Sequence, residues 1–117
     1  MYKRQEPESF QIPKSSQEKI EEARKNKARI ISVGTTSLRA LEAYAEGTKE
    51  GWTSLFIYPG YKFKLVDCLL TNFHLPRTTL FMLTCAFGGE KLIKQAYQEA
   101  LDKQYRFYSY GDAMLII

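Results

Sequence analysis

The alternation of apolar and polar residues along the chain predicts several short strands separated by helices. Residues 29–33, RIISV, form a short β-rich apolar run, which is typical of a buried parallel strand. Residues 54–58, SLFIY, predict a second strand, and residues 64–71, KLVDCLLT, predict a third strand or a buried segment. The apolar tail at 113–117 indicates one more strand.

The segments between these runs carry apolar residues at helical spacing. They predict helices over 15–27, 35–46, 79–87 and 90–104, with Gly88-Gly89 as the break between the last two. Hydroxyl side chains are the expected helix caps, namely Ser15 or Ser16, then Thr35, Thr36 and Ser37, then Thr78 or Thr79.

Strands that alternate with helices predict the α/β class, with a partly parallel sheet flanked by helices. Residues 1–14 contain two prolines and many charges, so we expect an extended, poorly ordered entry segment before the domain at 15–117. The first apolar strand begins only at Arg29. This late start indicates the later part of a larger protein.

The composition narrows the class of protein further. Apolar residues make up 44% and charged residues 26%, which predicts a globular chain rather than a disordered one. The formal net charge of +4 permits an anionic partner such as a nucleic acid but does not require one. Cys68 and Cys85 have no zinc spacing, so we expect buried, reduced thiols. No signal peptide or bilayer-spanning run is visible, and a cytoplasmic setting without membrane contact is expected.

The turn GTTSLR, residues 34–39, lies between a predicted strand and a predicted helix. Its backbone N–H groups and the positive end of the helix dipole suit a phosphate or carboxylate, to which Arg39 could add a fork of donors. The alternative is a plain capped helix with a surface arginine.

The stretch 58–67 interleaves Tyr58, Tyr61 and Phe63 with lysines. Aromatic rings among cations can stack on bases while the cations contact phosphates, although a strand with tyrosines packed inside explains the same pattern. Asp67 stands in an apolar neighbourhood, so its carboxylate is either a structural hydrogen-bonding hub or a site residue.

His74 is the single histidine of the chain, and Asn72 lies two residues before it. In an extended conformation both side chains point to the same side. Pro76 fixes the path into a helix start, where Thr78 presents free amides. A base near neutral pH beside a helix N-terminus is a plausible catalytic group, although a lone histidine among apolar residues is more often structural.

The segment YRFYSYGD, residues 105–112, gathers aromatic residues around one glycine turn. It either covers the core or forms a base-stacking and sugar-binding edge. In the second case Tyr108 and Tyr110 are candidates for contact with a base, Arg106 for contact with a phosphate, and Asp112 for contact with a hydroxyl or amine.

Three stretches, taken in order and at their spacing, carry a family resemblance. They are VGTTSLRALE, GWTSLFIYPGYKFKLVDCLLTNFHLPRTTLFMLTCAFGG and YRFYSYGDAMLI. Together they resemble the C-terminal part of the S-adenosylmethionine:tRNA ribosyltransferase-isomerases of queuosine biosynthesis (the QueA family). Family members also carry an inserted β-barrel domain, which is absent here, so the resemblance implies a C-terminal fragment.

The resemblance implies an enzyme that is both transferase and isomerase. The family moves the ribosyl group of S-adenosylmethionine to 7-aminomethyl-7-deazaguanine in the wobble position of a tRNA with a GUN anticodon. The ribosyl group is rearranged, the tRNA then carries epoxyqueuosine, and adenine and methionine leave. S-adenosylmethionine is the ribosyl donor, and no metal is required by this chemistry.

Roles for individual residues follow as expectations from that reaction. His74 is the first candidate for the base, with Asp67 or Asp112 as its partner. The methionine end of the cofactor is expected at Gly34, Thr35, Thr36, Ser37, Arg39 and Asn72. The target base and its phosphates are expected at Tyr58, Tyr61, Arg106, Tyr108 and Tyr110.

Two other readings remain open at this point. The chain could be a non-catalytic RNA- or nucleotide-binding fragment that lacks half of the active site. It could also be an inactive piece that self-associates through an exposed sheet edge, whereas we expect a full-length family member to be monomeric.

Overall fold

The computed structural model describes residues 8–48, 50–53, 57, 59–74, 78–106 and 112–117. Its elements in chain order are β1 (Glu8–Gln11), α1 (Lys14–Lys25), β2 (Ile31–Val33), α2 (Thr35–Ala45), β3 (Glu50–Thr53), β4 (Cys68–Asn72), α3 (Thr79–Gly88), α4 (Glu90–Asp102) and β5 (Ala113–Ile116). Within these ranges no helix is both long and apolar enough to cross a bilayer.

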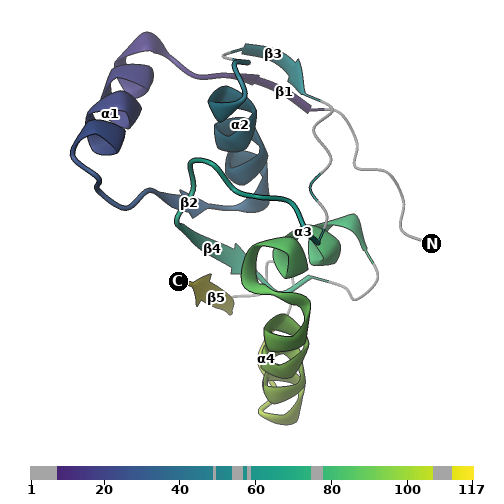
Figure 1. Cartoon of the computed structure of the whole chain (residues 1–117). Helices are drawn as coiled ribbons and strands as arrows, with labels where there is room; N and C mark the ends of the chain where they lie inside the picture. Colours follow the sequence, from purple (N-terminus) through teal and green to yellow (C-terminus); the bar gives the residue numbers. More distant parts are fainter. Residues whose placement is uncertain (1–7, 49, 54–56, 58, 75–77, 107–111) are drawn as a thin grey trace.

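A three-stranded mixed sheet organises the C-terminal three quarters of the chain, from β2 onward, with the order β2-β4-β5 (Figure 1). β2 runs parallel to β4, with Ile31 opposite Cys68, and β5 runs antiparallel to β4, with Asn72 opposite Ala113. The α/β class with a partly parallel sheet flanked by helices is therefore confirmed. The apolar runs predicted the places of β2 and β4 correctly. β4 is the central strand, whereas β2 lies at an edge of the described sheet with only Ser32 buried, so β2 is parallel as expected but not the buried strand that was expected.

A second, two-stranded sheet joins β1 to β3 in antiparallel fashion. The sequence predicted only an extended segment at 1–14, yet Glu8–Gln11 pairs residue by residue with Glu50–Thr53. The strand predicted at 54–58 falls almost wholly outside the described residues. Only Ile57 of that run is described, and it is fully buried in the core.

The core is built on the face of the sheet that carries Leu69, whose side chain is fully buried. Leu38 of α2, Leu83 of α3 and Ile93 of α4 belong to the same buried cluster, so all three helices pack toward one centre. Both cysteines are buried and form no disulfide, as expected. α1 buries no residue and lies apart from this core (Figure 1).

The helix caps differ from the prediction at two of three places. Pro13 precedes α1 and Gly34 precedes α2, and neither helix start has a side-chain cap. Gly34 has φ 92°, a left-handed value that favours glycine, so the backbone itself makes this turn. At α3 the prediction is confirmed, because the Thr78 hydroxyl accepts from the Phe81 N–H at 3.2 Å.

The break between α3 and α4 is set by two glycines. Gly89 has φ 90° and ends one helix while it begins the next. A Cβ atom at Gly88 would lie 2.6 Å from Ile93 Cδ1 and 2.9 Å from Ile93 Cγ1, so any larger residue here would force Ile93 to move.

Candidate functional site

The carboxyl ends of β2 and β4 meet at one edge of the sheet, which is where open α/β sheets bind ligands. Beyond β2, the Gly34 N–H donates to the Leu70 carbonyl of β4 at 2.8 Å. Beyond β4, Asn72 pairs with Ala113, which places Asp112 at the same edge. The structure thus brings the 34–37 turn, the 72–74 segment and Asp112 together. We call this region the carboxyl edge.

The first turn of α2 forms one side of the carboxyl edge. Thr36 and Ser37 are exposed, while Gly34 and Thr35 are half-buried. Because no side chain caps this helix, its first N–H groups and the positive end of its dipole remain available to an anion.

Arg39 does not belong to that exposed turn. It lies in the second turn of α2 and is only 3% exposed, on the buried side of the helix with Leu38 and Glu42. The expectation of a surface fork of donors at the helix start does not agree with this position, because helical rotation turns Arg39 toward the core.

His74 lies just beyond β4 and is held at two points. Its Nε2 atom is 2.9 Å from Thr71 Oγ1, and its backbone N–H donates to the Tyr97 hydroxyl at 2.7 Å. Burial lowers the pKa of the imidazole below its ordinary value, so the ring is neutral at pH 7. A neutral imidazole can accept a proton, which is the property required of a base.

Tyr97 of α4 connects this segment to the core. Its ring makes edge-to-face contacts with Phe73, at 5.3 Å between centroids, and with Phe81, at 4.8 Å. Burial raises the pKa of Tyr97 to about 12, so its hydroxyl stays protonated while it accepts from the His74 amide. The aromatic packing therefore fixes the backbone of the carboxyl edge.

Asp112 closes the segment before β5. Its Oδ2 atom accepts from the Arg106 N–H at 2.6 Å and from Arg106 Nε at 3.4 Å. The backbone hydrogen bond, with the Arg106 side chain adding to it, lowers the pKa of Asp112. Asp112 is therefore an ionised carboxylate at the carboxyl edge, and Arg106 is an exposed cation beside it.

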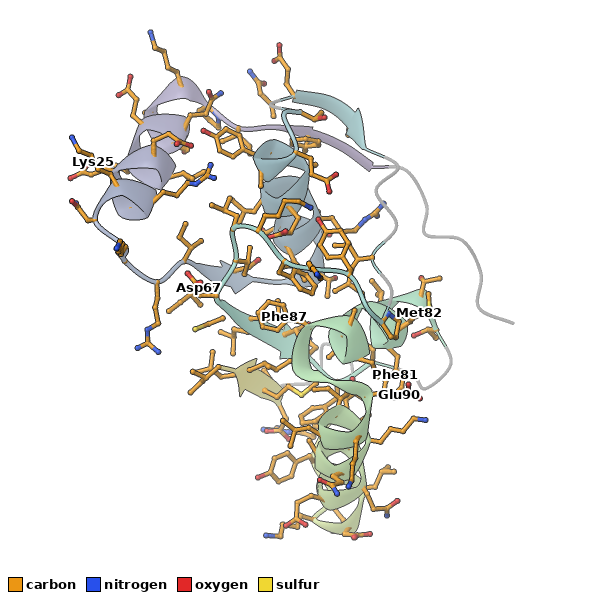
Figure 2. All side chains as sticks on the ribbon, viewed as in Figure 1. Lys25, Asp67, Phe81, Met82, Phe87 and Glu90 are labelled. Atoms are coloured by element: carbon orange, nitrogen blue, oxygen red, sulfur yellow. The ribbon has the colours of Figure 1, made fainter. Side chains whose placement is uncertain are left out.

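Asp67 lies at the opposite end of β4. Its Oδ2 atom accepts from the Ile30 N–H at 2.8 Å, which joins the starts of β2 and β4. In Figure 2 it stands at the end of the sheet away from Phe81 and Met82 of α3. The structure does not bring Asp67 to His74, because the five residues of β4 extend about 17 Å between them.

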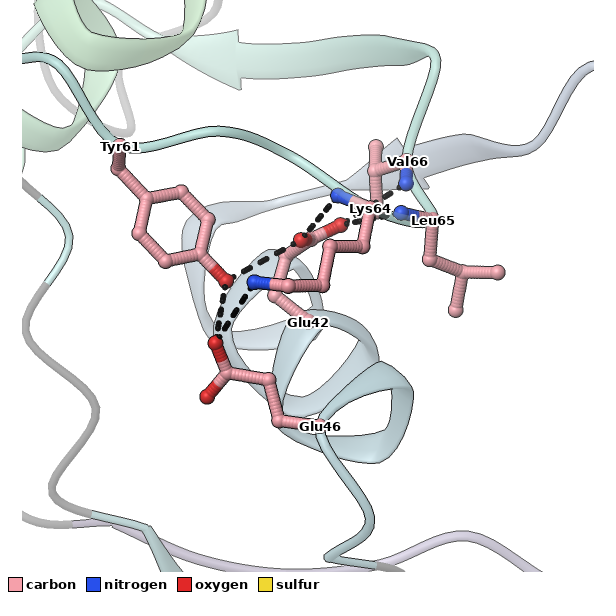
Figure 3. Close-up of polar contacts among 6 residues, drawn as sticks. All are labelled: Glu42, Glu46, Tyr61, Lys64, Leu65 and Val66. Atoms are coloured by element: carbon pink, nitrogen blue, oxygen red, sulfur yellow. Dashed lines mark hydrogen bonds and ion pairs between the residues drawn. The ribbon is translucent and has the colours of Figure 1, made fainter.

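Tyr61 contacts a buried carboxylate that the sequence analysis missed. Glu42 is fully buried and accepts backbone N–H groups from Lys64 at 2.8 Å, and from Leu65 and Val66 at 2.9 Å. The Tyr61 hydroxyl lies 3.3 Å from Glu42 and 3.2 Å from Glu46 (Figure 3). Burial, together with these two carboxylates, raises the pKa of Tyr61. Tyr61 thus belongs to a structural hub, not to the carboxyl edge.

Three of the expected base-contacting residues, Tyr58, Tyr108 and Tyr110, lie outside the described residues. Two residues that the sequence analysis did not select, Thr71 and Tyr97, contact His74 directly. Thr71 had one available signal, because it faces the buried side of a strand on which a hydroxyl needs a partner. Across the described ranges no three His, Cys, Asp or Glu side chains cluster as metal ligands, and the absence of a metal stays a prediction.

Comparisons with known proteins place these segments in a family. The model of the family described as "Queuosine biosynthesis protein" matches residues 2–116. The chain is 60% identical over 110 residues to the S-adenosylmethionine:tRNA ribosyltransferase-isomerase of Polynucleobacter asymbioticus, which covers 93% of this chain and 32% of that protein. It is 54% identical over 114 residues to the protein of the same name from Aquifex aeolicus, covering 97% of this chain and 34% of that protein.

A crystal structure of the S-adenosylmethionine tRNA ribosyltransferase of Thermotoga maritima is also similar. It matches with a TM-score of 0.89 and 50% identity, over 93% of this chain and 40% of that one. The chain thus spans about a third of the length of the curated relatives that it matches. It belongs to the queuosine biosynthesis protein family.

Proposed function

We propose that this chain provides part of an S-adenosylmethionine-dependent tRNA ribosyltransferase-isomerase of queuosine biosynthesis. The observation that carries the proposal is the family match over residues 2–116, which includes every segment of the carboxyl edge. The enzyme transfers and isomerises the ribosyl group of S-adenosylmethionine onto 7-aminomethyl-7-deazaguanine in the tRNA anticodon. Epoxyqueuosine, adenine and methionine are the products. We infer a cytoplasmic protein, since its RNA substrate is there.

His74 is the proposed base of this reaction. A carbon next to a sulfonium holds acidic hydrogens, and a neutral imidazole within reach can remove one of them. Burial keeps His74 neutral, so the ring can take up a proton at physiological pH. General base catalysis of this kind contributes about 10²-fold to 10⁴-fold in rate.

The two charged groups of S-adenosylmethionine, a carboxylate and a sulfonium, have groups of opposite charge at the carboxyl edge. The methionine carboxylate is proposed at the uncapped start of α2, where Thr36 and Ser37 are exposed. The sulfonium cation is proposed near Asp112, whose lowered pKa keeps it ionised. Asn72 is exposed between these two and is proposed to contact the same ligand.

A binding module without catalysis is a second candidate, and one observation favours it. A pocket of about 340 Å³ at the starts of β2 and β4 is lined by basic side chains and by Asp67. The cations are Arg24, Lys27, Arg29 and Lys64. Such a cluster suits the phosphates of an RNA backbone and requires no chemistry.

Product analysis separates the two candidates. The chain is incubated with S-adenosylmethionine and a tRNA that carries 7-aminomethyl-7-deazaguanine, and free adenine and the mass of the modified nucleoside are measured. Adenine release with the mass of epoxyqueuosine supports the enzyme. Retention of tRNA with no adenine above a protein-free control supports the binding module. The matched variant His74→Gln, which keeps a polar side chain of similar size, should lower adenine release about 10²-fold to 10⁴-fold if the base is correctly assigned.

A further inference from the structure

The two nitrogens of His74 have different surroundings. Nε2 is 2.9 Å from the hydroxyl of Thr71, a β4 residue that is 3% exposed. No partner is assigned to Nδ1 among the residues that the structure describes. The ring is half-buried, and its Nε2 side is occupied by Thr71.

The backbone of His74 is fixed from a different element. Its N–H donates to the hydroxyl of Tyr97 on α4, at 2.7 Å, and that tyrosine is 4% exposed. Phe73 and Phe81 pack edge-on against the Tyr97 ring. The side chain is therefore set by a strand and the main chain by a helix, which leaves the imidazole little freedom to rotate.

We propose that Thr71 and Tyr97 are positioning residues that hold His74 as its Nε2–H tautomer and present Nδ1 as the reactive lone pair. In this arrangement the Thr71 hydroxyl accepts from Nε2–H. The role of Nδ1 as the base rests on the proposed function, whereas the tautomer and the two anchors do not.

The proton balance of the step agrees with this assignment. The C–H bond next to the sulfonium breaks, its electron pair stays on that carbon, and a new N–H bond forms at Nδ1. The ring becomes an imidazolium, and its Nε2–H···Oγ1 bond strengthens because the donor is now charged. The proton then leaves Nδ1 to water. The opposite tautomer would protonate Nδ1 and leave the basic lone pair on Nε2, where it would accept from the Thr71 hydroxyl.

Nitrogen NMR tests the tautomer directly, since the chain has one histidine and gives one imidazole signal set. In the wild-type chain at pH 8 we expect Nε2 to resonate as a protonated nitrogen and Nδ1 as an unprotonated one. Thr71→Ser should keep this pattern, and Thr71→Val should move both nitrogens toward the average of a free imidazole. Thr84→Val is the matched control, because Thr84 is a buried threonine whose hydroxyl bonds to the Leu80 carbonyl and not to His74.

The backbone anchor has a separate readout. Tyr97→Phe keeps the packed ring and removes the hydroxyl, so the His74 amide should exchange with solvent about 10-fold faster or more while the tautomer pattern holds. An unchanged exchange rate overturns the role of Tyr97. A wild-type spectrum with the proton on Nδ1, or a Thr71→Val spectrum identical to wild type, overturns the role of Thr71. The wild-type spectrum decides the tautomer even if a variant fails to fold.

Turnover distinguishes this inference from the proposed function. If adenine is released by the wild type, Thr71→Val should lower kcat about 10-fold to 100-fold with little change in KM, and Thr71→Ser should restore it. If the tautomer is found as expected but no adenine is released, the proposed function fails and the positioning of His74 stands. If adenine is released at equal rates by the wild type and Thr71→Val, the positioning role fails and the function stands.

Discussion

Both ends of the parallel β2–β4 pair carry polar groups, but the two ends differ in whether these groups already have hydrogen-bond partners. At the amino end, the carboxylate of Asp67 accepts a backbone N–H and joins the two strands, and the nearby Glu42 accepts three such groups. At the carboxyl end, the start of α2 is uncapped and one imidazole nitrogen has no assigned partner in the described part. Polar groups that are saturated by backbone stabilise the fold, whereas those left open are available to a ligand.

This comparison predicts that His74 contributes strongly to turnover and little to the free energy of unfolding. His74→Ala should lower turnover about 10²-fold to 10⁴-fold, because the general base is lost. Its unfolding free energy should change by only about 1 kcal/mol, since the ring is half-buried. Adenine release and urea denaturation measure the two effects. Near-normal turnover of a folded His74→Ala protein would remove the histidine from the mechanism.

Glu42 is predicted to behave in the opposite way. Glu42→Ala leaves the N–H groups of Lys64, Leu65 and Val66 without their acceptor and should cost about 3–5 kcal/mol of unfolding free energy. Glu46→Ala is the matched control at the C-cap of the same helix, because Glu46 is exposed and pairs with an exposed lysine. Urea denaturation of both variants measures the difference. Equal stability of the two would contradict the structural hub.

Asp67 and Asp112 test the same difference between the two ends of the sheet with one residue type. Asp67→Asn should cost about 1 kcal/mol of stability, because it weakens the charged acceptor of the Ile30 N–H, and should leave turnover unchanged. Asp112→Asn should instead raise KM for S-adenosylmethionine about 10-fold, because the sulfonium loses an opposite charge. Steady-state kinetics on both variants provide the measurement. An increase in KM at Asp67 equal to that at Asp112 would contradict the placement of S-adenosylmethionine at the carboxyl edge.

The exposed edge of the sheet is predicted to mediate self-association. β2 has only β4 as a neighbour in the described sheet, and its Ile31 and Val33 side chains are 55% and 66% exposed. Val33→Lys should weaken a dimer several-fold, because a charge on the strand disfavours pairing. Sedimentation over a concentration series measures this. A wild-type chain that remains monomeric at every concentration would rule out the association.

The sequence predicted the elements whose signals are local. The runs of β2 and β4, the glycine break before α4 and the Thr78 cap are all readable within a few neighbouring residues. The predicted hydroxyl cap of α2 was wrong, because Gly34 with its positive φ makes that turn and no side chain caps the helix.

The parts that escaped prediction depend on distant contacts. Glu42 stands four residues after Leu38, on the apolar face of its helix, but its acceptor role depends on N–H groups more than twenty residues away. Tyr97 fits a helical apolar pattern, which hides its bond to His74, 23 residues earlier. No local pattern shows that two such residues meet, because the tertiary fold alone brings them together.

The smallest predicted effect is a pH dependence of stability due to His74. Burial lowers its pKa in the folded chain below the value of about 6.5 expected on unfolding, so the unfolded chain binds more protons. Its contribution is complete above about pH 7 and is lost as the pH falls through the folded pKa. Tyr97, with a pKa of about 12, does not titrate in this window. Urea denaturation between pH 5 and 8 should show a slope in the wild type that His74→Gln lacks, and carboxylates that titrate in both proteins cancel in the difference. Equal slopes, or an NMR midpoint of the imidazole at 6.5 or above, would mean that the ring is solvated. The difference proposed between the amino and carboxyl ends of the β2–β4 pair would then no longer hold for His74.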